Sequence, residues 1–322
     1  MNKLNDIELS KKLIKDLYLD LRKNTILWSK ITNQTPQARM GYIGQHLTSV
    51  VTGFKGGKSG ARGYDLILSE NDYGEIKTCY RIDQLGICKN CGNSVSSIEN
   101  YCSLCNSNNI ERKNDSKWLI TLSTIEDYKN ITSPKYYYFV LFEYVNLNFN
   151  NDIVVKIWKV DTQNIGFILC MIDYWHNIRA VSKSAAPFNC WPYQLKFGLM
   201  KPYLIYHSII KENDEIETLL FPNINDEILE EIDFPTFSRA KTITLDSLIQ
   251  TLKELSPNNN LLKSNNLKKN EILIELNNLK LNINYNVIID TLAKNIYLPL
   301  IIKHKEQIPD NLKKYINFSK LY

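Results

Sequence analysis

Asp65, Glu75 and Lys77 place two carboxylates and one ammonium group within a short stretch of chain. Side chains alternate between the faces of a strand, so Glu75 and Lys77 should share one face while Ile76 points to the other. We expect Asp65 on the preceding strand of a hairpin, where pairing brings it beside that shared face. Two carboxylates can hold a hard cation such as Mg²⁺, and a lysine can orient or deprotonate a water and stabilise phosphate charge. Metal-dependent hydrolysis of a phosphodiester requires this grouping.

The spacing of these three residues is a loose pattern when taken alone. The alternative interpretation is a surface hairpin in which Glu75 and Lys77 merely alternate with apolar residues. Two segments are expected to precede the site: a helix over residues 37–51 and a glycine-rich turn over 53–63. Two strands follow, over residues 64–68 and 75–81, and a turn over 69–74 joins them.

The glycine-rich turn also contains Gly57, Lys58 and Ser59, which resemble the end of a phosphate-binding P-loop. That motif needs a glycine where this chain has Thr52, and it follows a strand rather than a helix. We therefore exclude nucleotide hydrolysis through this loop.

A second cluster of reactive residues consists of four cysteines in two Cys-x-x-Cys pairs, Cys88 with Cys91 and Cys102 with Cys105, separated by ten residues. Four thiolates at this spacing predict a closed, tetrahedral zinc site that stabilises structure and performs no chemistry. A disulfide framework is the competing interpretation, but a cytosolic chain does not favour it. The remaining cysteines are expected to be packed thiols and are Cys79, Cys170 and Cys190.

The periodicity of the rest of the chain predicts a sheet-containing domain followed by helices. The first thirty residues read as an amphipathic helix, and the further strands are expected over residues 118–123, 136–144 and 153–160. No clear pattern covers residues 164–201. We expect a nuclease-like domain over residues 1–240, with a zinc-ribbon insert at 82–117, and a helical C-terminal domain over 241–322.

The C-terminal segment contains two helical patterns, over residues 270–279 and 285–295, joined by a short link. A helix pair of this kind in a basic segment is a candidate helix-turn-helix or winged-helix unit for DNA binding or dimerisation. An ordinary packed helix pair is the alternative, because most helix pairs do not contact DNA.

Charge and composition set broad limits on the partner and the compartment. The net charge of +5 is the sum of +5, −5 and +5 over residues 1–120, 121–240 and 241–322, so a polyanion would prefer the two ends. A hydrophobic content of 44% and a charged content of 23% are typical of a folded chain and exclude extensive disorder. Because the N-terminal segment lacks a signal-peptide core and no apolar run is long enough to cross a bilayer, we expect a cytoplasmic protein without a membrane partner.

Residues 37–81 resemble the PD-(D/E)xK nuclease superfamily in their helix, glycine-rich turn and Tyr-Asp-Leu strand. The resemblance implies an α/β fold with a mixed central sheet flanked by helices. It also implies that Asp65, Glu75 and the backbone carbonyl of Ile76 bind Mg²⁺ and that Lys77 is catalytic. The chain departs from the superfamily at Gln45, where many relatives have an acid, and at Tyr64, which replaces the proline of the family name.

With the four-cysteine insert and residues 112–118, the segment from about 37 to 120 is similar to the MamI-like zinc-containing type II restriction endonucleases. That similarity implies a homodimer that uses Mg²⁺ to cleave both strands of a specific site in double-stranded DNA and carries structural Zn²⁺. Basic residues that are candidates for DNA contact, or else are solvated surface charges, are Lys58, Arg62, Lys89, Arg112, Lys113, Lys117, Arg179 and Lys183.

Two other functions stay open at the level of sequence. One is a structure-selective repair or junction nuclease of the same superfamily. The other is a non-catalytic zinc-ribbon DNA-binding protein in which the hairpin acids are ordinary surface residues. No segment carries a decipherable code for the bases that would be read.

Overall fold

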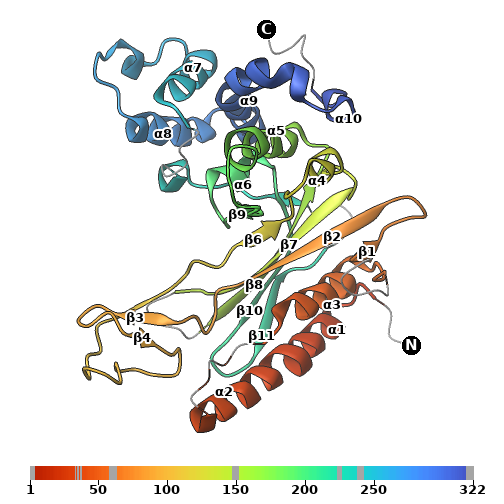
Figure 1. Cartoon of the computed structure of the whole chain (residues 1–322), viewed down its shortest axis with the longest axis vertical. Helices are drawn as coiled ribbons and strands as arrows, with labels where there is room; N and C mark the ends of the chain where they lie inside the picture. The colour runs from red at the N-terminus through yellow and green to blue at the C-terminus, as the bar shows by residue number, and fades with distance from the viewer. Residues whose placement is uncertain are drawn as a thin grey trace. The chain divides into compact units, whose positions relative to one another are not determined.

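The computed structural model describes residues 4–32, 34, 36, 38–57, 64–146, 152–222, 227–237 and 243–316 (Figure 1). The fold is mixed α/β, as expected, with a mixed sheet and helices. The chain forms two compact units. The first comprises Met1–Trp118, Tyr138–Lys159 and Leu204–Glu227, and the second comprises Leu119–Tyr137, Val160–Tyr203 and Ile228–Tyr322.

The largest sheet has seven strands among the described residues, and its main path runs in the order β1-β2-β7-β8-β10-β11, with β12 paired to β10. The strands are β1 (Leu66–Ile67), β2 (Tyr73–Tyr80), β7 (Tyr136–Tyr144), β8 (Ile153–Asp161), β10 (Tyr203–Ile210), β11 (Ile216–Leu220) and β12 (Ile228–Leu229). Residues 137–142 of β7 are all buried, so this strand is covered on both faces. Its continuous run of aromatic and branched residues is typical of a central strand.

The N-terminal helix predicted over the first thirty residues is confirmed. It consists of α1 (Ile7–Leu13), a π-helical segment (Ile14–Leu19) and α2 (Asp20–Thr32). The side chain of Asp6 caps its start by accepting from the backbone N–H groups of Glu8 and Leu9.

The second predicted helix, α3 (Met40–Thr52), ends at Gly53, whose φ of 79° is the left-handed conformation that glycine favours. Helix α3 packs against β2 through Gly44, since a Cβ added at Gly44 would lie 2.0 Å from Oγ1 of Thr78. The missing side chain therefore allows the helix to approach the strand closely.

The predicted insert forms a small separate sheet in the order β4-β3-β5. Its strands are β3 (Gly86–Cys88), β4 (Ser94–Val95) and β5 (Ile110–Arg112). Its core consists only of Cys88, Val95 and Cys102, with Ile110 packed against them. A core of this size needs a further stabilising element to hold its fold.

The second unit is built around α5 (Ile165–Tyr174), whose residues from Gly166 onward are all buried. A helix that is apolar on every side lacks the periodicity from which helices are predicted, which explains why the sequence showed no pattern over residues 164–201. The same stretch holds a π-helical turn (Trp175–Arg179), β9 (Phe188–Cys190), which pairs with β6 (Trp118–Ile120), and α6 (Leu195–Leu199).

The remaining helices of this unit are α4 (Ile125–Lys129), α7 (Leu245–Leu255), α8 (Lys269–Asn278), α9 (Tyr285–His304) and α10 (Asp310–Lys313), with short 3₁₀ turns at Phe234–Phe237, Asn260–Lys263, Leu279–Leu281 and Lys305–Gln307. Thr244 caps α7 as predicted, accepting from the backbone N–H of Ser247. Helix α9 continues past the predicted end at 295 and packs against α5, α6 and α7.

The two units divide the chain differently from the boundary expected near residue 240. Residues from 243 onward belong to the second unit together with the earlier segments 119–137 and 160–203, because α9 packs on α5 and α6. No helix among the described residues is long and apolar enough to span a membrane.

Candidate active site

The hairpin of β1 and β2 brings Asp65 beside Glu75. The strands pair antiparallel, with Leu66 opposite Gly74, so the next pair outward is Asp65 with Glu75. The Asp65 carboxylate is fixed from this side by the backbone N–H of Ile76, which donates to Oδ2 at 2.8 Å. The two carboxylates therefore lie side by side at the open end of the hairpin, as the sequence predicted.

Alternation along β2 places Glu75 and Lys77 on one face and buries Ile76 on the other. Nζ of Lys77 lies 2.7 Å from Oε1 of Glu75. The Lys77 side chain is 22% exposed and the Glu75 side chain is 27% exposed, so the ion pair is partly buried but still in contact with solvent. Both groups are therefore accessible to water.

Gln45 joins the site from α3. Its Nε2 donates to Oδ1 of Asp65 at 2.6 Å, so that both oxygens of this carboxylate accept a hydrogen bond. The close packing of Gly44 on Thr78 sets the distance of α3 from β2, and Gln45 is the next residue on that helix. The glutamine thus orients Asp65 by donating to it.

The electrostatics of the site favour a bound cation. Burial, and next the charge of Glu75, raises the pKa of the Asp65 carboxyl above its ordinary value. The backbone N–H of Ile76, the Lys77 ammonium and the Gln45 amide act in the opposite direction. Two adjacent carboxylates with partial burial are a hard-oxygen donor set, and a divalent cation between them would remove their mutual repulsion. The residues present therefore fit a magnesium ion.

Two tyrosines flank the carboxylates. The rings of Tyr64 and Tyr73 stack with centroids 3.8 Å apart, and Tyr64 is 55% exposed. Tyr73 shares its strand face with Glu75, so the aromatic pair lies next to the two acids. This stacking was not predicted from the sequence, in which Tyr64 is only a departure from a family pattern.

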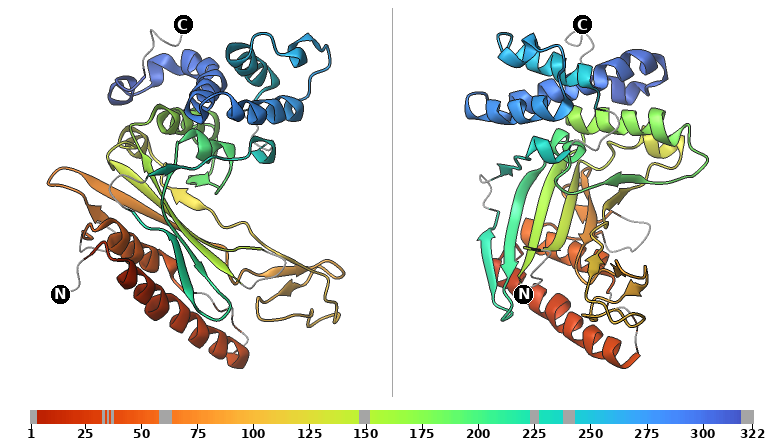
Figure 2. Two further views of the ribbon diagram at one scale, coloured as in Figure 1. Left: turned by 180° about the vertical axis from the view of Figure 1, so that it is seen from behind. Right: turned by 90° about the vertical axis from the view of Figure 1, so that its left-hand side faces the viewer.

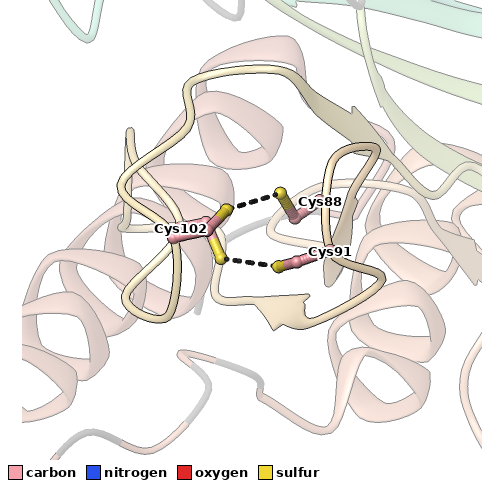
Figure 3. A group of neighbouring side chains, drawn as sticks. Cys88, Cys91 and Cys102 are labelled. Carbon is pink, nitrogen blue, oxygen red and sulfur yellow. Dashed lines mark hydrogen bonds between the residues drawn. The ribbon is translucent and has the colours of Figure 1, made fainter.

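The four cysteines of the insert converge, as predicted. Their Sγ atoms all lie within 4.8 Å of one another, and Figure 3 shows Cys88, Cys91 and Cys102 pointing toward a common centre. The Sγ atoms of Cys88 and Cys105, and those of Cys91 and Cys102, are 3.5 Å apart. Zinc–sulfur bonds of about 2.3 Å in a tetrahedron would separate the sulfurs by about 3.8 Å, whereas a disulfide would need about 2.05 Å. The cluster therefore fits a tetrahedral metal ion.

Each Cys-x-x-Cys pair is shaped by the same tight turn. The residue after the second cysteine has a positive φ, 75° for Gly92 and 55° for Asn106. Its backbone N–H donates to the carbonyl of the first cysteine, Cys88 or Cys102. The backbone N–H of Cys105 also lowers the pKa of the Cys102 thiol to about 6.

The predicted DNA-contact residues of the first unit have different environments. Lys58 and Arg62 lie outside the described residues. Lys89 is exposed and forms an ion pair with Glu111, while Lys113 is exposed. Lys117 directly follows Ser116, whose backbone carbonyl accepts a hydrogen bond from Nε of Arg81, the residue after the end of β2.

The guanidinium groups of Arg112 and Arg179 donate hydrogen bonds to backbone carbonyls. Arg112 donates to the carbonyls of Ser96 and Glu99, and Arg179 donates to the carbonyl of Ser123. Lys183, in the second unit, is exposed. The guanidinium groups of both arginines therefore have a structural role, which no local sequence pattern predicts.

Comparison with known proteins gives one match. The family model described as MamI restriction endonuclease matches residues 27–236 of this chain. This segment contains the hairpin with Asp65, Glu75 and Lys77 and the whole four-cysteine insert. No curated protein and no solved structure matches the chain.

Proposed function

The chain belongs to the MamI restriction endonuclease family, and we propose that it is a type II enzyme that hydrolyses both strands of duplex DNA at a specific site with the help of Mg²⁺. The observation that carries the proposal is the arrangement of Asp65, Glu75 and Lys77 on paired strands, with both oxygens of Asp65 fixed by hydrogen bonds. Membership in the family supports DNA as the substrate.

Asp65 and Glu75 would hold the magnesium ion, with the carbonyl of Ile76 as a further ligand. When bound, the ion supplies Lewis acidity, lowering the pKa of a water and neutralising charge on the phosphate. The hydrogen bonds from Gln45 and from the Ile76 N–H keep the Asp65 carboxylate in one orientation. This preorganisation lowers the cost of arranging the site during the reaction.

Lys77 acts on the attacking water and on the phosphate. Its ammonium group, 2.7 Å from Oε1 of Glu75, lies where it can orient a water by donating a hydrogen bond to it, and where it can stabilise developing negative charge. Because the side chain is only partly exposed, its charge is screened less than that of a surface lysine.

The four-cysteine cluster would hold structural Zn²⁺. All four ligand positions would be filled by Cys88, Cys91, Cys102 and Cys105, which leaves no open position for substrate. The ion would stabilise the insert, whose apolar core is too small to fold alone.

We also propose a homodimer, because a two-fold symmetric pair of sites matches a palindromic duplex and cleaves both strands. The basic residues of the first unit, Lys89, Lys113 and Lys117, are the candidates for contact with the DNA backbone. Lysine contacts of this kind position the duplex and do not read its sequence.

The test is digestion of unmethylated phage and plasmid DNA of known sequence with purified, zinc-loaded protein and Mg²⁺. We expect discrete fragments whose ends map to one short sequence, and their loss in Asp65→Ala. The matched control is Glu70→Ala, which removes an exposed acid from the turn of the same hairpin and should leave cleavage intact.

Three other results would contradict the proposal. Intact DNA after digestion with zinc-loaded protein excludes it. Cleavage of branched but not linear DNA identifies a structure-selective nuclease of the same superfamily. A gel shift that persists in Asp65→Ala, without cleavage in Mg²⁺ or Mn²⁺, identifies a non-catalytic DNA-binding protein.

A further inference from the structure

The N-terminal helix carries a row of large apolar side chains in solvent. Leu17 and Leu21 are 39% and 40% exposed, and the exposure rises along the helix to 56% for Leu27, 62% for Trp28 and 67% for Ile31. We call these five residues the N-terminal stripe. Figures 1 and 2 show the C-terminal end of α2 extending past α3. Within the described residues of its unit nothing covers the stripe.

The stripe is separate from the face that packs in the protein. Ile14, Tyr18 and Ser29 are buried, and Arg22 is bound to Asp83 by two hydrogen bonds of 2.9 Å. These residues follow one face of the helix at spacings of three and four. The stripe lies on the neighbouring face, so the helix already has its internal packing partner and presents a second apolar surface.

Isolated exposed apolar residues are ordinary, but a continuous row is not. Together the five residues expose on the order of 500 Å² of largely apolar surface, which is at the upper end of the patches found on monomers. Two copies facing each other would bury about 1,000 Å² from these side chains alone, and the surrounding polar residues add to this. That total is close to the minimum of about 1,000 Å² for a biological interface, so the polar residues around the stripe must supply the rest of the about 1,200 Å² or more that a stable dimer buries.

The order of residues along the stripe is self-complementary. In an antiparallel pair with its two-fold axis near Asn24, Leu17 meets Ile31 of the partner subunit. Leu21 then meets Leu27 of the partner subunit, with the partner's Trp28 one residue further along. Isologous contacts of this kind are what a two-fold dimer requires.

The exposed charges agree with the same pairing. Asp20 precedes Asn24 by four residues and Lys30 follows it by six. With the two-fold axis at Asn24, the lysine of one helix therefore lies two residues, about 3 Å along the helix, past the position opposite the acid of the other, within reach of its long side chain. Both side chains are exposed, and neither forms a salt bridge within the described part of the chain. The neighbouring Lys23 is paired with Asp214 inside its own subunit.

We propose that the N-terminal stripe on α2 is the dimer interface, and that its partner is the same stripe of a second copy of this chain in antiparallel orientation. The proposal rests on the proposed function only in that a two-site enzyme needs a dimer. The surface itself, the residue order and the charges are independent of any catalytic role.

The mass of the free protein tests the proposal without DNA or Mg²⁺. By light scattering at micromolar concentration, we expect the wild-type protein at twice the chain mass of 37.5 kDa. The single variants Trp28→Lys and Ile31→Lys should each have the monomer mass. The melting temperature of each variant subunit should equal that of the wild-type subunit diluted until it is monomeric. The matched control is Leu104→Lys, which places the same charge at a 71% exposed leucine of the insert and should leave the dimer intact.

A charge reversal tests the orientation. Asp20→Lys and Lys30→Glu should each weaken the dimer about threefold to tenfold, since two symmetric ion pairs are lost. The double variant should restore wild-type affinity. A parallel dimer would place Asp20 against Asp20 and Lys30 against Lys30, so each single variant would then not weaken it.

A monomeric wild-type protein, or a dimer that survives both Trp28→Lys and Ile31→Lys, overturns the proposal. These outcomes are distinguishable from failure of the proposed function. A dimer that does not cleave DNA supports the proposed interface and contradicts the proposed nuclease function. A protein that cleaves DNA but is monomeric at every concentration contradicts the interface and supports the nuclease function.

Discussion

Gly44→Ala should weaken both the fold and the active site, because the added Cβ has no room. It would lie 2.0 Å from Oγ1 of Thr78, and rotation of the threonine gives only partial relief, because its Cβ and Cγ2 already lie at 3.1 and 3.2 Å. Carbon atoms need about 3.5 Å, so α3 must move away from β2, by roughly 1 Å where Thr78 keeps its rotamer.

The magnitude follows from two opposing effects. Overpacking in a buried site costs about 1–3 kcal/mol, while replacing glycine by alanine in a helix contributes up to about 1 kcal/mol of stability. We expect a net loss of about 1–2 kcal/mol in the free energy of unfolding. A shift of about 1 Å also lengthens the 2.6 Å bond from Gln45 to Asp65 beyond hydrogen-bond distance, and a displacement of that size can lower a catalytic rate about a hundredfold.

Urea unfolding and single-turnover DNA cleavage measure the two effects. Gly41→Ala is the matched control, since a Cβ there meets nothing within 4 Å and should cost neither stability nor activity. Thr78→Ala removes a buried hydroxyl that has no hydrogen-bond partner, so it should be nearly neutral alone and should recover most of the loss in the double variant with Gly44→Ala. Wild-type stability in Gly44→Ala, or no recovery in the double variant, would refute the reasoning.

Three further predictions concern the insert and the acid pair. Chelation of zinc, or Cys102→Ser, should expose residues 86–112 to protease and hydrogen exchange, and a resistant insert without metal would contradict a structural role. Arg112→Ala should cost about 1–3 kcal/mol of local stability, read by exchange at residues 96–99, because two carbonyls lose their donor; Lys113→Ala should not. Burial and Glu75 raise the pKa of Asp65, so its protonated form is favoured by folding, and the resulting stability is present at low pH and lost as pH rises through the folded pKa. Without added divalent metal, Asp65→Asn should therefore melt higher than wild type at neutral pH, with the difference vanishing below about pH 4; an equal or lower melting temperature at pH 7 would contradict this.

The hairpin and the insert were predictable because their signals are local. Alternation of polar and apolar residues around Glu75 and Lys77 reports a strand directly, and Cys-x-x-Cys spacing reports a metal site whatever the surrounding fold. The structure confirms the neighbouring positions of Asp65 and Glu75 and the convergence of the four cysteines.

The tertiary contacts were not predictable in the same way. The hydrogen bond from Gln45 to Asp65 depends on how α3 packs against β2, which no local pattern encodes. The stacking of Tyr64 on Tyr73 likewise depends on how the residues before β1 pack against β2. Helix α5 was missed because a fully buried helix has no polar face. The packing of α9 on α5 and α6, which lie far away in sequence, is likewise not encoded by any local pattern.

The most direct test of the account is the cleavage rate of Lys77→Met at a mapped site, measured in Mg²⁺ under single-turnover conditions beside DNA affinity in Ca²⁺. We expect a rate about 10²–10⁴-fold below wild type with affinity unchanged within threefold, because in the proposed mechanism the lysine acts on the water and the phosphate in the transition state. Wild-type cleavage by Lys77→Met would contradict the assignment of the site.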